Sequence, residues 1–273
     1  MSQSNPPDAD ARHASDDDVL RVDALRHGLR GLMLGNPFIY LPAVGSTNTY
    51  ASELARAGAA EGALVTTDYQ TAGRGRVGRS WKPLPNQQLI LSFILRPTFL
   101  AHYLIMASAL AVAEAIEAET PLRAEIKWPN DVLVNGRKVC GALIETSEGA
   151  AILGMGLNVN GALSDDPELA ARATTLAAEA GRPISREPLA IALIRRLDDL
   201  YRQLATGGVA AQRALRDRWR ARLVTLGRRA TIHQTPHWPD TLEGLAVDVN
   251  ADGALLLRLD DGQLLTITWG DVE

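Results

Sequence analysis

The spacing of apolar residues along the chain switches between the two periods that distinguish strands from helices. Short apolar or β-branched runs predict strands at residues 38–41, 63–70, 89–97, 124–128 and 151–160. Longer segments in which apolar residues recur about every three to four positions predict helices at residues 19–33, 47–58 and 101–119 and across 166–222. The chain is therefore expected to contain a sheet with helices packed on it.

The dipeptide Asn135-Gly136 separates two further apolar stretches and predicts a tight β-hairpin. Lys138 then begins the returning strand. Because side chains alternate between the two faces of a strand, Lys138 is expected on the face that carries residues 140, 142 and 144, opposite Val139 and residue 143. A lysine among apolar neighbours is either a snorkelling surface residue or a fixed cation.

The pattern of apolar residues changes at about Val224. From there on, short apolar segments are separated by turn signals such as Asp260-Asp261-Gly262. Four such segments in the last ~50 residues predict a small separate barrel. The first residues, MSQSNPPDADARHASDDD, are polar and acidic. We therefore divide the chain into a disordered tail at 1–18, a large domain at 19–223 and a small domain at 224–273.

Composition places the chain among ordinary globular proteins. Its 273 residues are 46% hydrophobic and 22% charged, which favours neither a disordered protein nor a membrane protein. No apolar run reaches the ~18–20 residues that a spanning helix needs. A single cysteine, Cys140, excludes an internal disulfide, and the start of the chain is unlike a secretory signal, so we expect a cytoplasmic protein. The formal net charge of -4 argues against a general nucleic-acid coat.

The segment TAGRGRVGRSW at residues 71–81 concentrates positive charge on a flexible backbone. Its glycines at 73, 75 and 78 allow close backbone approach. Its arginines at 74, 76 and 79 offer planar guanidinium groups that match phosphate oxygens. This pattern predicts an anion site at the end of the strand 63–70. An exposed turn with solvated arginines and an RGG-like nucleic-acid contact have the same composition.

Three further polar motifs stand at the ends of predicted elements. KWPND at 127–131 presents Asn130 and Asp131 after a proline that excludes helix at Trp128. GMGLNVN at 154–160 presents Asn158, and Ser46 begins a helix as its N-cap. Each motif also has a purely structural interpretation, as a turn with Trp128 in the core, a strand-end cap or a helix cap.

Taken in order, STN, DYQTAGRGRVGRSW, KWPNDVLVNGRKVCGALIE and GMGLNVN closely resemble the motifs of the biotin protein ligases, in the short form without an N-terminal DNA-binding domain. The resemblance covers residues 36–273. It implies an α+β fold: a mixed-sheet catalytic domain of the biotin/lipoate ligase type over 19–223 and a C-terminal Src-homology-3-like β-barrel over 224–273. Two segments depart from the pattern: residues 86–89 (NQQL) replace a glycine-rich turn, and WGDVE replaces a usual Gly-Glu pair.

The resemblance implies an enzyme that joins biotin to ATP as biotinyl-5′-AMP, releasing pyrophosphate, and then transfers the biotinyl group to one lysine of a biotin carboxyl carrier protein. Because the attacking carboxylate and the α-phosphate are both anionic, fixed cations are needed to bring them together. Arg76, Lys138 and Asp131 would be catalytic, with Asp131 accepting a proton from the carrier lysine and holding the Mg²⁺ that accompanies ATP. Biotin would contact Ser46, Thr47, Asn48, Gln70, Arg74, Gly75, Arg76, Trp81 and Lys138. ATP would contact Arg74, Arg76, Arg79, Asn130, Asp131 and Asn158.

Two other functions stay open. A lipoate or octanoate protein ligase shares the fold and the adenylate chemistry, but its relatives tend to show an arginine pair followed by a glycine-rich, histidine-containing stretch, and this chain has none. A non-enzymatic nucleic-acid-binding or adaptor protein is disfavoured by the negative net charge and by an aromatic content of 5%. The 45 residues before STN are too few for a recognition domain with a linker, so no sequence-specific DNA binding is expected. The oligomeric state is left open.

Overall fold

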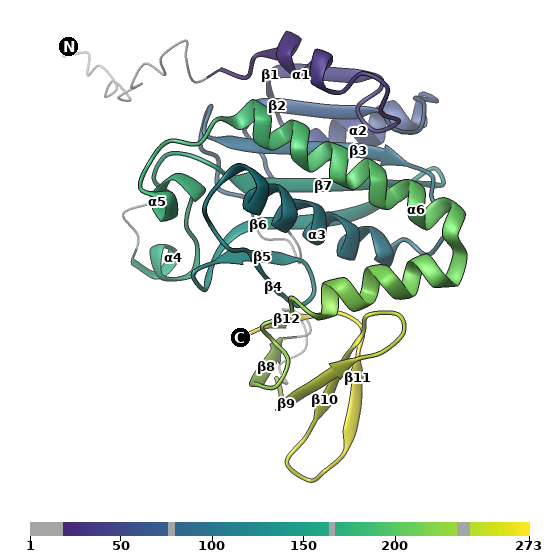
Figure 1. Cartoon of the computed structure of the whole chain (residues 1–273), viewed down its shortest axis with the longest axis vertical. Helices are drawn as coiled ribbons and strands as arrows, with labels where there is room; N and C mark the ends of the chain where they lie inside the picture. The colour runs from purple at the N-terminus through teal and green to yellow at the C-terminus, as the bar shows by residue number, and fades with distance from the viewer. Residues whose placement is uncertain (1–18, 76–79, 164–166, 234–240) are drawn as a thin grey trace, which may run out of the picture.

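A mixed seven-stranded sheet forms the centre of the computed structural model, which describes residues 19–75, 80–163, 167–233 and 241–273 (Figure 1). The strand order is β1-β2-β3-β7-β6-β5-β4; β1 and β2 pair in parallel and the other neighbours are antiparallel. The strands are β1 Phe38–Val44, β2 Leu64–Gln70, β3 Gln88–Leu95, β4 Glu125–Lys127, β5 Asp131–Val134, β6 Arg137–Ser147 and β7 Ala150–Asn158.

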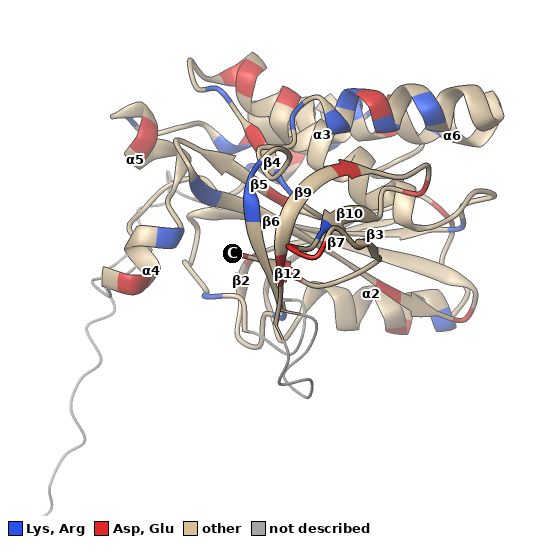
Figure 2. Ribbon diagram, turned by 90° about the horizontal axis from the view of Figure 1, so that it is seen from below, with Lys and Arg blue, Asp and Glu red and all other residues tan. Residues whose placement is uncertain are grey.

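Two long helices cover one face of this sheet and one shorter helix covers the other. α3 (His102–Glu119) and α6 (Arg186–Arg220) lie together on one side, whereas α2 (Thr47–Arg56) lies on the opposite side (Figure 2). The alanine-rich sequence of α3 is buried around nearly its whole circumference, which explains why its pattern shows little polar stripe. Among the described residues, no helix combines the length and the apolar character that crossing a membrane requires.

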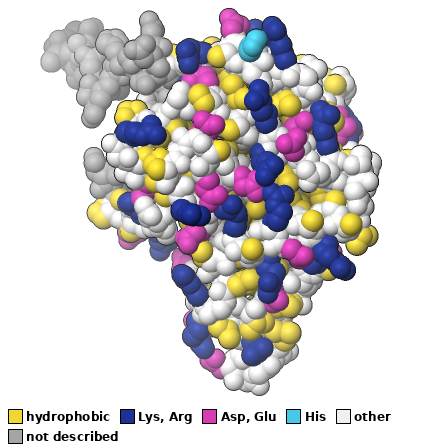
Figure 3. All heavy atoms as spheres, in the orientation of Figure 1, with side chains coloured by type: hydrophobic (Ala, Val, Ile, Leu, Met, Phe, Trp, Pro, Cys, Tyr) yellow, Lys and Arg dark blue, Asp and Glu magenta, His cyan; other side chains and the backbone are white. Residues whose placement is uncertain are grey.

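Charges of both signs are mixed over the outer surface of α3 and α6 (Figure 3). Arg222 and Glu117 form a two-pronged pair with N···O distances of 2.8 Å, and Arg196 and Arg218 both reach Glu114. This face therefore carries paired charges rather than the continuous basic surface that nucleic-acid binding needs.

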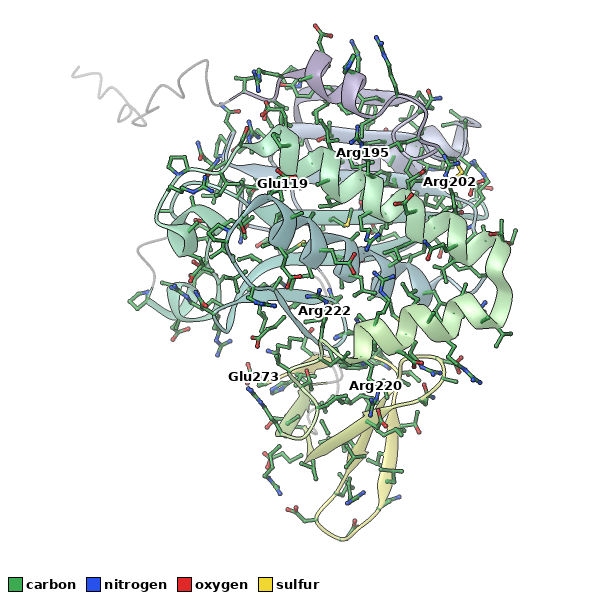
Figure 4. All side chains as sticks on the ribbon, in the orientation of Figure 1. Glu119, Arg195, Arg202, Arg220, Arg222 and Glu273 are labelled. Carbon is green, nitrogen blue, oxygen red and sulfur yellow. The ribbon has the colours of Figure 1, made fainter. Side chains whose placement is uncertain are left out.

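The C-terminal region forms a second, five-stranded antiparallel sheet in the order β11-β10-β9-β8-β12. Trp128 connects it to the large sheet: its Nε1 donates to the Gly253 carbonyl at 2.9 Å, and its backbone N donates to Thr225 Oγ1 at 3.0 Å. Arg220 at the end of α6 adds a bond to Asp248 Oδ2 at 3.0 Å (Figure 4). The strands are β8 Arg229–His233, β9 Leu242–Val249, β10 Leu255–Arg258, β11 Leu264–Ile267 and β12 Asp271–Val272. The expected α+β architecture is thus confirmed, with one strand more than predicted in the small sheet, and the exact division at Val224 stays a prediction.

Two expected helices are shorter than their apolar pattern suggested. The first, predicted over 19–33, is confined to α1 (Val22–Gly28), and just beyond its C-cap Leu29 the residue Gly31 adopts a φ of 80°, which does not fit a helix. The stretch 166–222 contains α4 (Pro167–Arg172), α5 (Leu176–Ala180) and α6, which is itself interrupted at Gly208 with φ 55° and ψ -146°. The tail predicted at 1–18 lies outside the described residues.

The predicted hairpin is present, but the face assigned to Lys138 was wrong. Asn135 and Gly136 adopt φ values of 50° and 76°, as a two-residue hairpin turn requires. Just beyond it the register shifts, because Val132 pairs with Cys140 while Leu133 pairs with Lys138. This bulge places one extra residue on β6 and reverses the alternation of faces.

After the bulge, Lys138 shares a face with Gly141 rather than with Cys140. A Cβ atom on Gly141 would lie 3.0 Å from Lys138 Nζ, whereas Cys140 is buried in the core on the other face. A simple count of alternating positions could not detect the bulge, since the extra residue is visible only in the pairing of the two strands.

Within residues 86–89, which replace a glycine-rich turn, Asn86 and Gln87 belong to a turn, and Gln88 and Leu89 already begin β3. Asn86 takes a φ of 58°, and its backbone N donates to the Asp68 carbonyl at 3.0 Å. Asparagine tolerates this left-handed conformation better than other residues with a side chain. Asn86→Ala is therefore expected to lower the free energy of unfolding by about 1 kcal/mol, and Asn86→Gly to leave it within about 0.5 kcal/mol. Urea denaturation measures both; equal stability of the alanine variant would contradict the strain argument.

Candidate functional site

A cavity of about 280 Å³ opens on the α2 side of the large sheet, and the candidate residues converge on it. Arg76 and Arg79 lie outside the described residues. Every other residue predicted to touch biotin or ATP lines this cavity: Ser46, Thr47, Asn48, Gln70, Arg74, Gly75, Trp81, Asn130, Asp131, Lys138 and Asn158. Segments that are more than 100 positions apart in the sequence are thus brought to one place by the sheet.

One end of the cavity is a buried hydrogen-bonded cluster around the first turn of α2. Gln70 Oε1, at the end of β2, accepts from Thr47 N at 2.8 Å and from Thr47 Oγ1 at 3.0 Å. Ser92 Oγ of β3 lies 2.7 Å from Thr47 Oγ1 and 2.6 Å from Asn48 Oδ1. Sequence reasoning missed Ser92, although a single serine inside the apolar run LILSFIL was the signal for it. The cluster offers donors and acceptors in fixed positions, as a small polar head group requires.

Ser46 precedes this cluster without acting as a side-chain cap. It occupies the N-cap position of α2, but within the described structure its hydroxyl makes no capping bond. The predicted position is therefore confirmed, and the predicted capping bond is wrong. The Ser46 side chain lines the cavity instead.

Glu145, which was not among the predicted site residues, joins this cluster to the glycine-arginine loop, the segment 71–81 of the sequence. Glu145 Oε2 of β6 accepts from Asn48 Nδ2 at 2.8 Å and from Arg74 at 3.0 Å. Arg74 also donates to Thr49 Oγ1 at 3.1 Å. The first arginine of the loop is thereby held at the first turn of α2, next to the cavity.

Two glycines of β7 make room for the side chains that face them. A Cβ atom on Gly154 would lie 2.2 Å from Asn48 Oδ1, and one on Gly156 would lie 2.7 Å from the Trp81 ring. Because residues two apart share a strand face, both glycines open the same wall. GMG is therefore a spacing device that allows Asn48 and Trp81 to approach the sheet.

The charged residues of the wall are mostly cations. Lys138 Nζ lies 2.7 Å from Asp131 Oδ1, and both side chains are partly exposed. Among the described lining residues the cations are Arg74, Lys82 and Lys138, and the carboxylates are Asp131 and Asp271. Arg74 and Lys138 are each paired with a carboxylate, Glu145 and Asp131, so an anionic occupant would share these cations with their present partners. Asp271 comes from β12, so the C-terminal sheet contributes to this wall.

The asparagines of the wall are fixed by hydrogen bonds. Asn130 Nδ2 donates to the Ala142 carbonyl at 2.7 Å. Asn158 Oδ1 accepts from Gln88 Nε2 at 2.9 Å, and its Nδ2 donates to the Thr174 carbonyl at 3.2 Å. Trp128 is a core residue with 2% of its surface exposed, in agreement with the structural interpretation of KWPND for that position.

The donor set for a metal is small. Within the parts of the chain that the structure describes, no three His, Cys, Asp or Glu side chains come together as a metal site. Asp131 and Asp271 are the carboxylates on the cavity wall. Since Mg²⁺ commonly binds through one or two carboxylates plus substrate phosphates, these residues fit a metal that arrives with a nucleotide.

Cys140 lies behind this wall and is expected to be chemically inert. Burial raises the pKa of its thiol to about 12, and the nearby Lys138 charge only partly offsets this effect. At pH 8 the thiol is therefore neutral, and the thiolate is the reactive form. We expect iodoacetamide to label Cys140 at pH 8 only after denaturation, as measured by mass spectrometry. Rapid labelling of the native protein would contradict this burial.

The chain is similar to known proteins along most of its length. Two family models match the chain: the Biotin/lipoate A/B protein ligase family over residues 40–161 and the Biotin protein ligase C terminal domain over residues 239–273. The Bifunctional ligase/repressor BirA of Bacillus subtilis is 34% identical over 263 residues, covering 93% of this chain and 79% of that protein. The Biotin--[acetyl-CoA-carboxylase] ligase of Mycobacterium tuberculosis is 33% identical, covering 94% and 98%.

Solved structures are similar over most of the chain. The biotin protein ligase from Aquifex aeolicus in complex with biotin and ATP is 27% identical, with a TM-score of 0.75, and the match covers 86% of this chain and 97% of that one. The biotin protein ligase from Leishmania major in complex with biotinyl-5-AMP is 25% identical, with a TM-score of 0.56, covering 85% and 98%. Both likenesses cover more than four fifths of this chain.

Proposed function

The chain belongs to the biotin protein ligase family, and from this premise we infer that it activates biotin with ATP as biotinyl-5′-AMP and transfers the biotinyl group to a protein lysine. The observation that carries this inference is a cavity that combines a fixed polar cluster at one end with cations and asparagines on its wall. The lipoate or octanoate alternative is not favoured, because the similar proteins described above are named as biotin ligases.

In the first step, an oxygen of the biotin carboxylate attacks the α-phosphorus of ATP, and the bond to the bridging oxygen of the leaving pyrophosphate breaks. The chain's part is to bind and orient both anions. We assign the polar cluster of Thr47, Asn48 and Gln70 to the ureido group, because its donors and acceptors are already fixed by mutual bonds. Ser46, Gly75 and Trp81 complete this biotin side of the wall.

The cations then balance the charge that accumulates where carboxylate and phosphate meet. Lys138 and Arg74 supply this charge in our proposal, and both line the cavity. A cation fixed in advance stabilises the developing charge without reorganisation, which is why such groups have large effects on rate. Arg76 and Arg79 lie outside the described residues, and their roles at ATP stay predictions.

In the second step, the amine of the acceptor lysine attacks the biotinyl carbonyl, an amide bond forms and AMP leaves with the electrons of the acyl-phosphate bond. We propose Asp131 as the group that accepts the proton lost by the amine, because its carboxylate lines the cavity next to Lys138. Asn130 and Asn158 are assigned to the nucleotide side. Mg²⁺ bound to the ATP phosphates and Asp131 would add positive charge there.

The proposed protein substrate is a biotin carboxyl carrier protein, as the name of the similar M. tuberculosis ligase suggests. We also propose that residues 19–223 form the catalytic domain and 224–273 the small second domain. The cytoplasmic location and the lack of sequence-specific DNA binding stay predictions.

Pyrophosphate release tests the function. The protein with Mg²⁺-ATP is expected to release pyrophosphate with biotin and not with lipoate, and to stop when EDTA removes the metal. Biotin alone should raise the melting temperature, since a ligand at about 100 times its Kd stabilises the folded state by ~2.7 kcal/mol, and biotin with ATP should raise it further. Pyrophosphate release with lipoate alone would overturn the proposal.

A further inference from the structure

We propose that Gln88 is a positioning residue for the adenylation step, because its side chain orients the amide of Asn158 and ties it to the segment that follows Trp81. The proposal rests on the proposed function, which assigns Asn158 to the nucleotide side of the cavity. Gln88 lies behind the cavity wall with 3% of its surface exposed. It therefore acts through its neighbours rather than by touching a ligand.

The contact between Gln88 and Asn158 fixes which way the asparagine amide points. Gln88 is the first residue of β3 and lies directly opposite Asn158, the last residue of β7. Gln88 Nε2 donates to Asn158 Oδ1 at 2.9 Å, while Asn158 Nδ2 donates to the Thr174 carbonyl at 3.2 Å. Since an amide has one donating and one accepting end, these two bonds allow a single orientation. The remaining N–H and lone pair of Asn158 are thereby presented in a defined direction.

The other hydrogen bonds of the Gln88 side chain reach residues 82–84, which follow the glycine-arginine loop. Nε2 donates to the Lys82 carbonyl at 3.1 Å, and Oε1 accepts from Leu84 N at 3.1 Å. Lys82 lines the cavity, and the preceding Trp81 packs over Gly156. One buried amide thus links the position of residues 81–84 to the orientation of Asn158.

The backbone of Gln88 is held independently of its side chain. Arg186 donates to the Gln88 carbonyl at 3.0 Å and to Asp68 Oδ1 at 2.7 Å, and both charged side chains are buried. Because this ion pair and the β3–β7 ladder fix the start of β3, a substitution at Gln88 changes the amide contacts and not the course of the strand. The role of the Gln88 side chain is therefore to orient the amide of Asn158.

Two substitutions test the hydrogen bonds of the Gln88 side chain separately from its shape. Gln88→Met keeps the length of the side chain and removes its three hydrogen bonds, and Gln88→Glu keeps its shape and removes its donors. Each is expected to raise the KM for ATP about tenfold in pyrophosphate release at saturating biotin, which corresponds to the loss of about one buried hydrogen bond. The KM for biotin at saturating ATP should change less than about twofold.

The pH profile tests the donor role itself. A buried carboxyl group has a raised pKa, so the Gln88→Glu side chain should regain a proton, and with it a donor, as the pH falls toward about 6. The ratio of its KM for ATP to that of the unmodified protein should then decrease. A ratio that stays constant with pH would contradict the donor role.

Gln87→Met is the matched control, because the Gln87 side chain packs against Gly161, 3.1 Å from a Cβ atom placed there. Both of its KM values should remain within about twofold. The proposal is wrong if the Gln88 variants keep the KM for ATP, or if the KM values for ATP and biotin rise equally. Melting temperatures identify any variant that has lost its fold. If Gln88→Met is unfolded, the pH dependence of the KM for ATP in Gln88→Glu tests the donor role. An unmodified protein that releases no pyrophosphate would refute the proposed function instead.

Discussion

Replacing Lys138 by methionine is expected to slow the formation of biotinyl-AMP by about 100- to 1000-fold, the usual effect of removing one preorganised charged donor from a reaction centre. Lys138 Nζ lies at the cavity wall, 2.7 Å from Asp131 Oδ1. Methionine has a similar length but no charge to offset the repulsion between carboxylate and phosphate. Single-turnover measurement of pyrophosphate release gives the rate directly.

The folded state should survive this change. Lys138 and Asp131 retain 32% and 24% of their side-chain exposure, so water can hydrate the carboxylate that loses its partner, and partly exposed ion pairs contribute little to stability. Lys127→Met is the matched control, since it removes the same charge from the nearby KWPND motif at a residue that is not part of the cavity wall. A rate for Lys138→Met within about threefold of the unmodified protein would remove Lys138 from the reaction.

Gly154→Ala is expected to weaken biotin binding by about 10- to 100-fold. The new methyl group would lie 2.2 Å from Asn48 Oδ1, so Asn48 must move, and with it the contacts to Ser92 and Glu145. Overpacking of this kind commonly costs about 1–3 kcal/mol, which is the range of affinity loss expected here. Isothermal titration with biotin in the absence of ATP measures the effect.

Gly45→Ala provides the comparison, because a Cβ atom there meets nothing within 4 Å. Gly45 directly precedes Ser46, so the control tests the same region of the chain without filling space. Its biotin affinity should stay within about twofold. If Gly154→Ala binds biotin as tightly as Gly45→Ala does, the polar cluster at Asn48 is not the biotin site.

The sequence motifs identified most residues of the candidate site but not the hydrogen bonds among them. The quoted motifs pointed to residues that the structure collects around one cavity. Ser92 was missed although it is the one polar residue of the apolar run LILSFIL, and Glu145 was missed because it stands where the apolar run GALI gives way to polar residues, which has no distinctive local pattern. Their importance comes from partners 44 and 97 positions away in the chain, Asn48 in both cases.

The face of the sheet on which Lys138 lies could not be predicted from the alternation of side chains along the strand. Alternation along β6 predicted the face of Cys140, yet the register shift at Val132 and Leu133 turns Lys138 toward Gly141 and the cavity. The face expected for Lys138 was therefore wrong, and its catalytic role stays a prediction. Asp271 is a second case, since only the packing of the C-terminal sheet brings it to the cavity wall.

The order of residues determined by itself which segments become strands and helices, where the Asn135-Gly136 turn falls and which motifs bear charge, because these properties depend on neighbours within a few positions. Tertiary structure alone decided the strand order, the bulge that aims Lys138, and the network joining Gln88, Asn158 and Arg186. The physical reason is that pairing, burial and hydrogen bonding between distant segments are properties of the packed chain. No local pattern contains them.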